Sequence, residues 1–251
     1  MGFYDNTKEV RALIADKIAA EIQSDFEAVA NKNIPRYFSD EDTYIRKNAY
    51  LAVGRIYFAN INLQELIIKT LENLLCSHSF RVRQTVINAA GEIGITDFSA
   101  VERIMETGLE DKHHSPRNAV IGSLKKMGEK NPVPVLGFAR KHINHPDAEI
   151  RREICHGIEL RGRTHPQEVL PLLKELEYES VARVKNMVVH VLGQIAYKKG
   201  CLETVVSELK TWGNKIVAEK AYEEIIDVHK RYKNFSYLTA KQAREYIEKN
   251  K

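Results

Sequence analysis

The sequence predicts an all-α protein: a right-handed α-solenoid of about six helical repeats that follow an N-terminal capping helix. Apolar residues recur three, seven and ten residues after a repeated cation, and these offsets mark one face of a helix. No segment alternates polar and apolar residues convincingly enough to predict a strand. The recurring cations, spaced 34 to 37 residues apart, are Arg46, Arg83, Arg117, Arg151 and Lys185.

The first predicted element is a long helix over residues 4–31, which would cap the open end of the repeat array within a segment of residues 1–36. Asn6 and Glu9 are spaced as a capping box at its start, and Pro35 either ends it or starts the next helix. Its apolar stripe consists of Val10, Leu13, Ile14, Ile18, Ile22 and Phe26.

Repeats are predicted to fill residues 37–232 and a basic helix residues 233–251, all within one domain spanning 1–251. Ser115 and Pro116 suit the N-cap and first position of one helix, and Thr239 with Gln242 forms a capping box before the last. Three glycines eight residues after a cation (Gly54, Gly91 and Gly193) are interpreted as packing glycines. The predicted helix pairs are 44–59 with 63–75, 81–93 with 100–108, 115–127 with 132–142, 148–160 with 166–176, and 181–197 with 202–212, followed by a degenerate unit at 215–232.

The turn before each cation resembles that of HEAT repeats, in which an aspartate of the turn and an arginine of the next helix form a ladder along the stack. Asp40 and Asp111 precede Arg46 and Arg117 by six residues and are therefore the expected partners. Arg83 and Arg151 follow Ser77 and His145 instead, so we expect those two arginines to be available to a ligand.

Charge is unevenly distributed in a chain whose formal net charge is only +4. Residues 112–163 hold eleven Lys and Arg against five Asp and Glu, and residues 230–251 hold seven against two. Two basic blocks on an otherwise acidic chain indicate a polyanionic partner, although solvated basic helix faces would give the same pattern.

The location predicted is cytoplasmic, with no membrane partner. The N-terminus has no secretory pattern, and the longest apolar runs are too short to span a bilayer. Three cysteines that lack a CxxC partner are expected to be reduced thiols.

Cations and a histidine of the repeats are the candidate nucleic-acid-binding residues, expected on the concave side of the array. Arg161 stands where the other repeats have an apolar residue, so it either faces a ligand groove or lies in solvent beyond the helix end. His156 and His190 share one repeat position, which favours the surface over the core. No metal-ligand or cofactor motif is present, so no metal, no cofactor and no catalytic residue is predicted. The candidate residues are Arg83, Arg117, Lys125, Lys126, Arg151, Arg152, Arg161, Arg163, Arg183, Lys185 and His190.

About a third of the chain resembles a narrower family. The stretches that carry this resemblance are the run His145-Pro-x4-Arg151-Arg152, the segment from Val169, the segment Val184-Lys-Asn to Ala196, and Trp212. Together they resemble the bacterial DNA alkylation-repair glycosylases built from HEAT-like repeats, the AlkC/AlkD superfamily. The resemblance implies that the protein grips double-stranded DNA by its phosphates, with Arg151 or Arg152 at the position of an arginine that meets the damaged nucleotide.

The match to that family is incomplete at the residues that carry catalysis. His190 stands where a tryptophan is expected, and Ser115-Pro-Arg-Asn118 stands where an acidic residue with tryptophans is expected. Excision of a cationic base needs a group that stabilises the developing positive charge. The resemblance therefore leaves open whether this is a DNA glycosylase or a DNA-binding protein without excision.

Two other functions are compatible with a HEAT-like array, because this fold hosts many unrelated functions. One is a protein-interaction scaffold that binds an acidic partner protein through the same basic face. The other is a tetrapyrrole-binding enzyme similar to phycobilin lyases, for which no residue of this sequence gives support.

Overall fold

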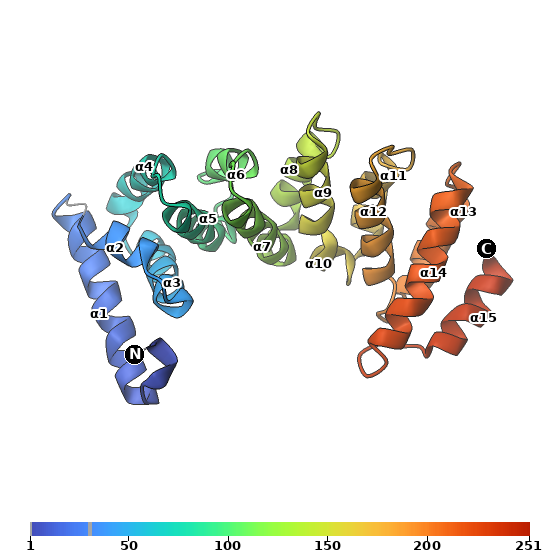
Figure 1. The fold of residues 1–251 in the computed structure, drawn as a ribbon, viewed down its shortest axis with the longest axis horizontal. Helices are drawn as coiled ribbons and strands as arrows, with labels where there is room; N and C mark the ends of the chain where they lie inside the picture. The colour runs from blue at the N-terminus through green and yellow to red at the C-terminus, as the bar shows by residue number, and fades with distance from the viewer. Residues whose placement is uncertain (1, 30–31) are drawn as a thin grey trace. The chain divides into compact units, whose positions relative to one another are not determined.

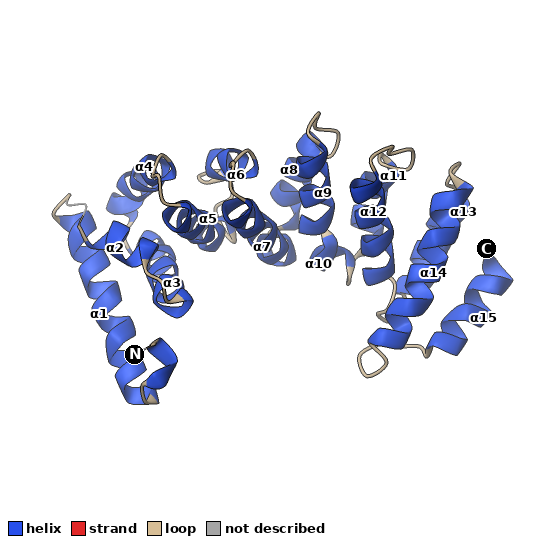
Figure 2. Ribbon diagram, in the orientation of Figure 1, coloured by secondary structure: helices blue, strands red, loops and turns tan. Residues whose placement is uncertain are grey.

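The computed structural model describes residues 2–29 and 32–251, and this part of the chain is helical throughout, with turns and loops but no strand (Figures 1 and 2). The prediction of an all-α repeat fold is confirmed. The chain forms two compact units, residues 1–123 and residues 124–251, and the boundary falls inside one helix, α7 (His114–Lys130). Within the described ranges, no helix combines the length and the apolarity needed to cross a membrane.

Unit 1 begins with a helix that differs in detail from the prediction. Helix α1 starts at Lys8, and Thr7 rather than Asn6 is its N-cap, because the Thr7 side chain accepts a hydrogen bond from the Val10 backbone. Only the later part of its apolar stripe is buried, from Ile18 onward, whereas Leu13 is 68% exposed. Residues 30 and 31 of the predicted helix lie outside the described residues. The helices of this unit are α1 (Lys8–Glu27), α2 (Asn33–Ser39), α3 (Thr43–Ala59), α4 (Gln64–Leu75), α5 (Phe80–Gly94), α6 (Glu102–Leu109) and the first part of α7, with short 3-10 turns at Phe3–Asp5 and Ile61–Leu63.

Unit 2 has two helical layers. Helices α9, α12 and α14 pack side by side, and α8, α11 and α13 form the layer behind them. The predicted core positions after the cation, such as Ile154, Val188 and Leu192, are fully buried between the layers. The bounds are α8 (Pro132–His142), α9 (Ala148–Gly157), α10 (Glu159–Gly162), α11 (Pro166–Lys174), α12 (Ala182–Gln194), α13 (Cys201–Lys210), α14 (Lys215–Arg231) and α15 (Ala240–Asn250).

The last helix, α15, packs against α13 and α14. The predicted capping box at its start is confirmed: the Thr239 side chain accepts a hydrogen bond from the Gln242 backbone, and the Gln242 side chain accepts one from the Thr239 backbone.

The five turns before the recurring cations share one hydrogen-bonding scheme. In each turn, the side chain six residues before the cation accepts a hydrogen bond from the backbone N–H two residues further on. A carboxylate, a hydroxyl or an imidazole nitrogen can therefore fill the same role. These bonds run from Asp42 to Asp40 (2.8 Å), Ser79 to Ser77 (3.2 Å), His113 to Asp111 (2.8 Å), Asp147 to His145 (3.0 Å) and Val181 to Glu179 (2.8 Å).

The arginines at the repeated position bind their own turns through the main chain. Arg83 donates to the Ser77 carbonyl oxygen at 2.7 Å, and Arg151 donates to the His145 carbonyl oxygen at 2.8 Å. Arg46 and Arg117 make the equivalent bond to the carbonyl oxygens of Asp40 and Asp111.

Arg83 and Arg151 also bind a carboxylate in the turn of the next repeat. Arg83 Nε lies 2.6 Å from Asp111 Oδ2, and Arg151 Nε lies 2.7 Å from Glu179 Oε2. The prediction that these two arginines are free for a ligand is therefore wrong. Burial alone would raise the pKa of Asp111, but the hydrogen bonds from Arg83 and from the His113 backbone, together with the charge of Arg83, outweigh burial and lower this pKa.

Candidate functional site

A row of polar side chains runs along two neighbouring helices of unit 2, and we call it the polar seam. Its first part lies on α9, on α10 and at Arg163, the residue that follows α10. Its members there are three or four positions apart in sequence, so they share one helical face. Three contacts connect this row to α12: Arg183 to Glu149 at 3.5 Å, His190 to Glu159 at 3.9 Å and Arg163 to Gln194 at 2.9 Å. The seam consists of Glu149, Arg152, His156, Glu159 and Arg163 on the first row and Arg183, His190 and Gln194 on α12.

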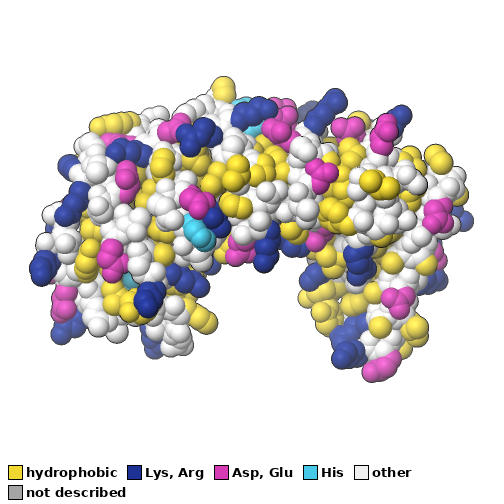
Figure 3. All heavy atoms as spheres, turned by 180° about the vertical axis from the view of Figure 1, so that it is seen from behind, with side chains coloured by type: hydrophobic (Ala, Val, Ile, Leu, Met, Phe, Trp, Pro, Cys, Tyr) yellow, Lys and Arg dark blue, Asp and Glu magenta, His cyan; other side chains and the backbone are white. Residues whose placement is uncertain are grey.

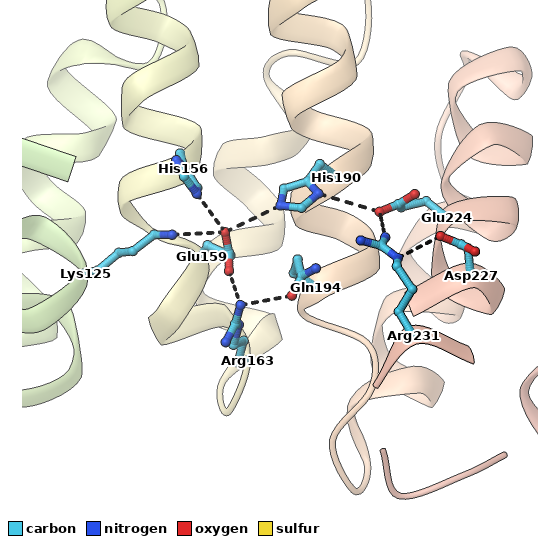
Figure 4. Close-up of polar contacts among 9 residues, drawn as sticks. All are labelled: Lys125, His156, Glu159, Arg163, His190, Gln194, Glu224, Asp227 and Arg231. Atoms are coloured by element: carbon cyan, nitrogen blue, oxygen red, sulfur yellow. Dashed lines mark hydrogen bonds and ion pairs between the residues drawn. The ribbon is translucent and has the colours of Figure 1, made fainter. Parts of the chain in front are cut away.

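Glu159 is the centre of this seam (Figure 4). One of its carboxylate oxygens, Oε2, lies 3.2 Å from Lys125 Nζ and 3.2 Å from His156 Nε2. The other oxygen accepts a hydrogen bond from the Arg163 guanidinium. Glu159 is only 2% exposed, and burial alone would raise its pKa. The hydrogen bond from His156 and the charges of Lys125 and Arg163 outweigh burial and lower the pKa of Glu159 to about 2.

The position of Glu159 in its repeat explains how it enters the interface between repeats. Eight residues after the cation, repeats one, two and five have glycine, and a Cβ at Gly193 would come within 2.5 Å of Glu224 Cγ. Repeats three and four have Lys125 and Glu159 at this position, and the two side chains form an ion pair across the repeats. A glycine replaced by opposite charges in consecutive repeats is the signal that sequence reasoning missed.

The network continues from α12 to α14 through His190. Its Nδ1 lies 3.6 Å from Glu224 Oε1, and Glu224 accepts a hydrogen bond from Arg231. Arg231 Nε also lies 2.7 Å from Asp227 Oδ2. His190 thus stands between two carboxylates that belong to different repeats (Figure 4).

At the opposite end of the seam, two arginines share one carboxylate. Arg152 Nε lies 3.0 Å from Glu149 Oε1, and Arg183 Nη1 lies 3.5 Å from Glu149 Oε2. The Arg183 side chain is 58% exposed, so it is the most accessible cation of the seam. Lys185, two residues further on, is half-buried, and among the described residues no carboxylate lies within ion-pair distance of its ammonium.

The structure brings together some of the predicted binding residues and separates others. Lys125, Arg152, Arg163, Arg183 and His190 belong to or contact the seam. The other predicted residues lie away from the seam. Arg83 and Arg151 form ion pairs with the turn of the next repeat, Arg117 binds its own turn, and Arg161 binds Glu168. Lys126 is exposed on α7.

Arg161 forms a two-point ion pair that accounts for its place on the apolar face. Its Nε and Nη2 donate to the two carboxylate oxygens of Glu168 at 2.9 and 2.7 Å. The side chain is 14% exposed, so it neither faces a groove nor extends into solvent, which were the two predicted alternatives. The fixed charge of an arginine is tolerated here because its hydrogen bonds are satisfied.

Comparison with solved structures places the fold among known ones. The structure of smu.31 from Streptococcus mutans UA159 matches with a TM-score of 0.57 and 17% sequence identity, over 75% of this chain and 95% of that chain. AlkD2 from Streptococcus mutans matches with a TM-score of 0.55 and 16% identity, over 82% of this chain and 97% of that chain. The chain shares their fold. No protein-family model and none of the curated proteins matches the sequence.

One face of the molecule has mixed charge. On the face seen in Figure 3, Lys and Arg side chains alternate with Asp and Glu side chains, and hydrophobic side chains are exposed between them. The charge pattern of this face therefore gives no single-sign patch of the kind that non-specific polyanion binding uses.

Proposed function

We propose that this chain is a helical-repeat DNA-binding protein that holds the phosphate backbone of double-stranded DNA at the polar seam of unit 2. The observation that carries the proposal is the sharing of carboxylates by cations. Lys125 and Arg163 both bind Glu159, and Arg152 and Arg183 both bind Glu149. A phosphate oxygen is a suitable acceptor for the guanidinium N–H groups that a shared carboxylate leaves unused.

Arg183 is the first residue expected to contact DNA. Its contact with Glu149 is long, at 3.5 Å, and the side chain is 58% exposed. Exposed ion pairs of this kind contribute little to stability, so exchange of the carboxylate for a phosphate has a small energetic cost. The resemblance of residues 145–212 to alkylation-repair glycosylases supports DNA as the polyanion.

Base excision is not part of the proposal. Glu159 is the buried carboxylate of the seam, but it is 2% exposed and both of its oxygens are engaged by Lys125, His156 and Arg163. A carboxylate that is saturated in this way does not reach a bound nucleotide. The seam therefore supports backbone binding rather than stabilisation of an oxocarbenium ion.

The test is fluorescence anisotropy with a labelled DNA duplex across a salt series. We expect affinity to fall linearly with the logarithm of salt concentration. Arg183→Gln should weaken binding to any sequence and reduce the salt slope by about one. Arg140→Gln is the matched control, because Arg140 is 66% exposed on α8, in the other layer. Absence of binding at low salt, or equal effects of the two substitutions, would overturn the proposal.

The alternative function is a scaffold that binds an acidic partner protein. The observation that favours it is the alternation of charge along and beside the seam, where Glu149 of the seam and Glu224 of α14 are partly exposed among the cations. Mixed charge suits a protein surface of matching pattern better than a uniform polyanion. A partner that co-purifies with the wild-type protein and is lost with Arg183→Gln, in a chain that does not bind DNA, would establish this function instead.

A further inference from the structure

We propose that His156, Glu159 and His190 form a binding site for Zn²⁺ or a divalent transition metal of similar ligand preference. The sequence predicts no metal site, because these residues belong to two repeats and match no metal-binding motif. In the structure, one ligand atom from each of the three residues lies within 4.8 Å of the other two. Two imidazoles and one carboxylate are an established ligand set for zinc sites that keep an open position.

The distances between the ligand atoms are close to those that a metal requires. His156 Nε2 lies 3.2 Å and His190 Nε2 lies 3.9 Å from the same oxygen, Glu159 Oε2. Zinc bonds of about 2.0–2.1 Å in a tetrahedral arrangement separate neighbouring ligand atoms by roughly 3.4 Å. Small side-chain rotations would therefore complete the site, and the backbone of α9, α10 and α12 can stay in place.

The groups around these ligands already hold them in the orientation that metal binding needs. His190 Nδ1 lies 3.6 Å from Glu224 Oε1, and Arg231 in turn binds Glu224. A carboxylate at the second nitrogen of a ligating histidine fixes the ring and increases the basicity of the nitrogen that binds metal. Arg163 binds the other oxygen of Glu159, which leaves Oε2 directed toward the two histidines (Figure 4).

The site is open on one side. The side chains of His156 and His190 are 31% and 37% exposed, whereas Glu159 is buried beneath them. Three protein ligands leave at least one coordination position for water or another small ligand. The expected occupant is thus a metal with an exchangeable ligand, not a closed structural metal.

Lys125 contacts the same carboxylate oxygen that the metal would bind. Its ammonium lies 3.2 Å from Glu159 Oε2. A metal cation on this oxygen would compete with the ammonium and be repelled by its like charge, and Lys125 can move away because its side chain is flexible and 22% exposed. This competition yields a specific expectation, since removal of the ammonium should increase metal affinity while loss of either histidine should decrease it.

The test is titration of the full, tag-free chain with ZnCl₂ after treatment with a chelator, read by competition with a chromophoric zinc indicator. We expect one Zn²⁺ per chain, at least about tenfold weaker binding by His156→Ala and by His190→Ala, and tighter binding by Lys125→Met. His78→Ala is the matched control, because His78 is exposed and lies in unit 1. Circular dichroism establishes that each variant is folded.

Two results would overturn the metal site. The first is wild-type zinc binding no tighter than that of the double variant His156→Ala/His190→Ala. The second is unchanged or weaker binding by folded Lys125→Met. Either result leaves the DNA proposal untouched, because that proposal is tested with Arg183→Gln in the absence of added metal.

Discussion

The carboxylate of Asp111 accepts two hydrogen bonds, of 2.6 and 3.0 Å, from the guanidinium of Arg83, which lies 28 residues earlier in the preceding repeat. Both side chains are largely buried, at 18% exposure for Arg83 and 8% for Asp111. Arg151 and Glu179 repeat the arrangement in unit 2 with the same separation of 28 residues. Each pair fastens one helix to the turn of the next repeat.

Asp111→Asn should lower the free energy of unfolding by about 1–3 kcal/mol, because it leaves the Arg83 guanidinium without its counter-charge. Urea unfolding of wild type, Asp111→Asn, Arg83→Met and the double variant would measure this. We expect the double variant to be more stable than the sum of the single effects predicts. Strict additivity would show that the two side chains do not stabilise each other.

Ser77→Asp should stabilise unit 1 by about 0.5–1 kcal/mol. Ser77 occupies the turn position that Asp111 occupies one repeat later, and its side chain makes the same hydrogen bond to the backbone two residues on. An aspartate there would keep this bond and place a carboxylate near Arg46, whose pKa is lowered by burial and by the charge of Arg81. Thermal unfolding would detect the gain, and the effect should vanish in an Arg46→Met background.

Glu159→Gln should destabilise unit 2 at neutral pH by about 2–3 kcal/mol, because Lys125 and Arg163 lose their common counter-ion. The pKa of Glu159 in the folded chain is about 2, below its ordinary value of 4.5. The charged form therefore stabilises the fold above about pH 4.5, and this contribution disappears as the pH falls toward 2.

Denaturant unfolding at a series of pH values would test this dependence. The difference in stability between wild type and Glu159→Gln should shrink as the solution is acidified below about pH 4.5. Glu245→Gln is the control, because the Glu245 side chain is 61% exposed on α15. A difference that stays constant with pH would contradict the assignment of the effect to the Glu159 charge.

Gly91→Ala and Gly122→Ala should have opposite effects on stability. A Cβ at Gly91 would come within 2.8 Å of Ser123 Cβ, whereas a Cβ at Gly122 has nothing within 4 Å. The first substitution should cost about 1–3 kcal/mol by overpacking, and the second should stabilise by about 0.4–1 kcal/mol because alanine favours the helix. Urea unfolding of both variants provides the comparison. Equal effects would mean that the repeats do not pack closely at Gly91.

The repeat period made the helices predictable, because the cation and three apolar positions recur together and each occurrence supports the others. The partners of the cations were not predictable. Asp40 lies six residues from Arg46, and this proximity in sequence suggested a pair within one turn. The arginines instead bind the main chain of their own turn and, at Arg83 and Arg151, a carboxylate of the next turn. The reach of a guanidinium across two repeats is a property of the packing.

The candidate site was predictable in part. The shared repeat position of His156 and His190 correctly indicated a surface, and both are half-exposed. The network around Glu159 was not foreseen, because it joins Lys125, His190 and Arg163 from three repeats. No short sequence window contains such a set. The sequence shows that Lys125 and Glu159 replace glycine at one repeat position. It does not show that the two side chains form an ion pair, because that depends on the close approach of adjacent helices.

The ladder between repeats also bears on how the chain unfolds. Stability in repeat proteins is a sum of repeat terms and nearest-neighbour coupling terms. In unit 1 the Arg83–Asp111 ion pair adds to the coupling between the second and third repeats. The equivalent position between the first and second repeats is Ser77, which is uncharged and forms no ion pair with Arg46. We therefore expect the coupling between repeats to differ along unit 1. In native-state hydrogen exchange, α5 should open together with the start of α7. Helix α3 should open at a lower free energy, as a separate foldon.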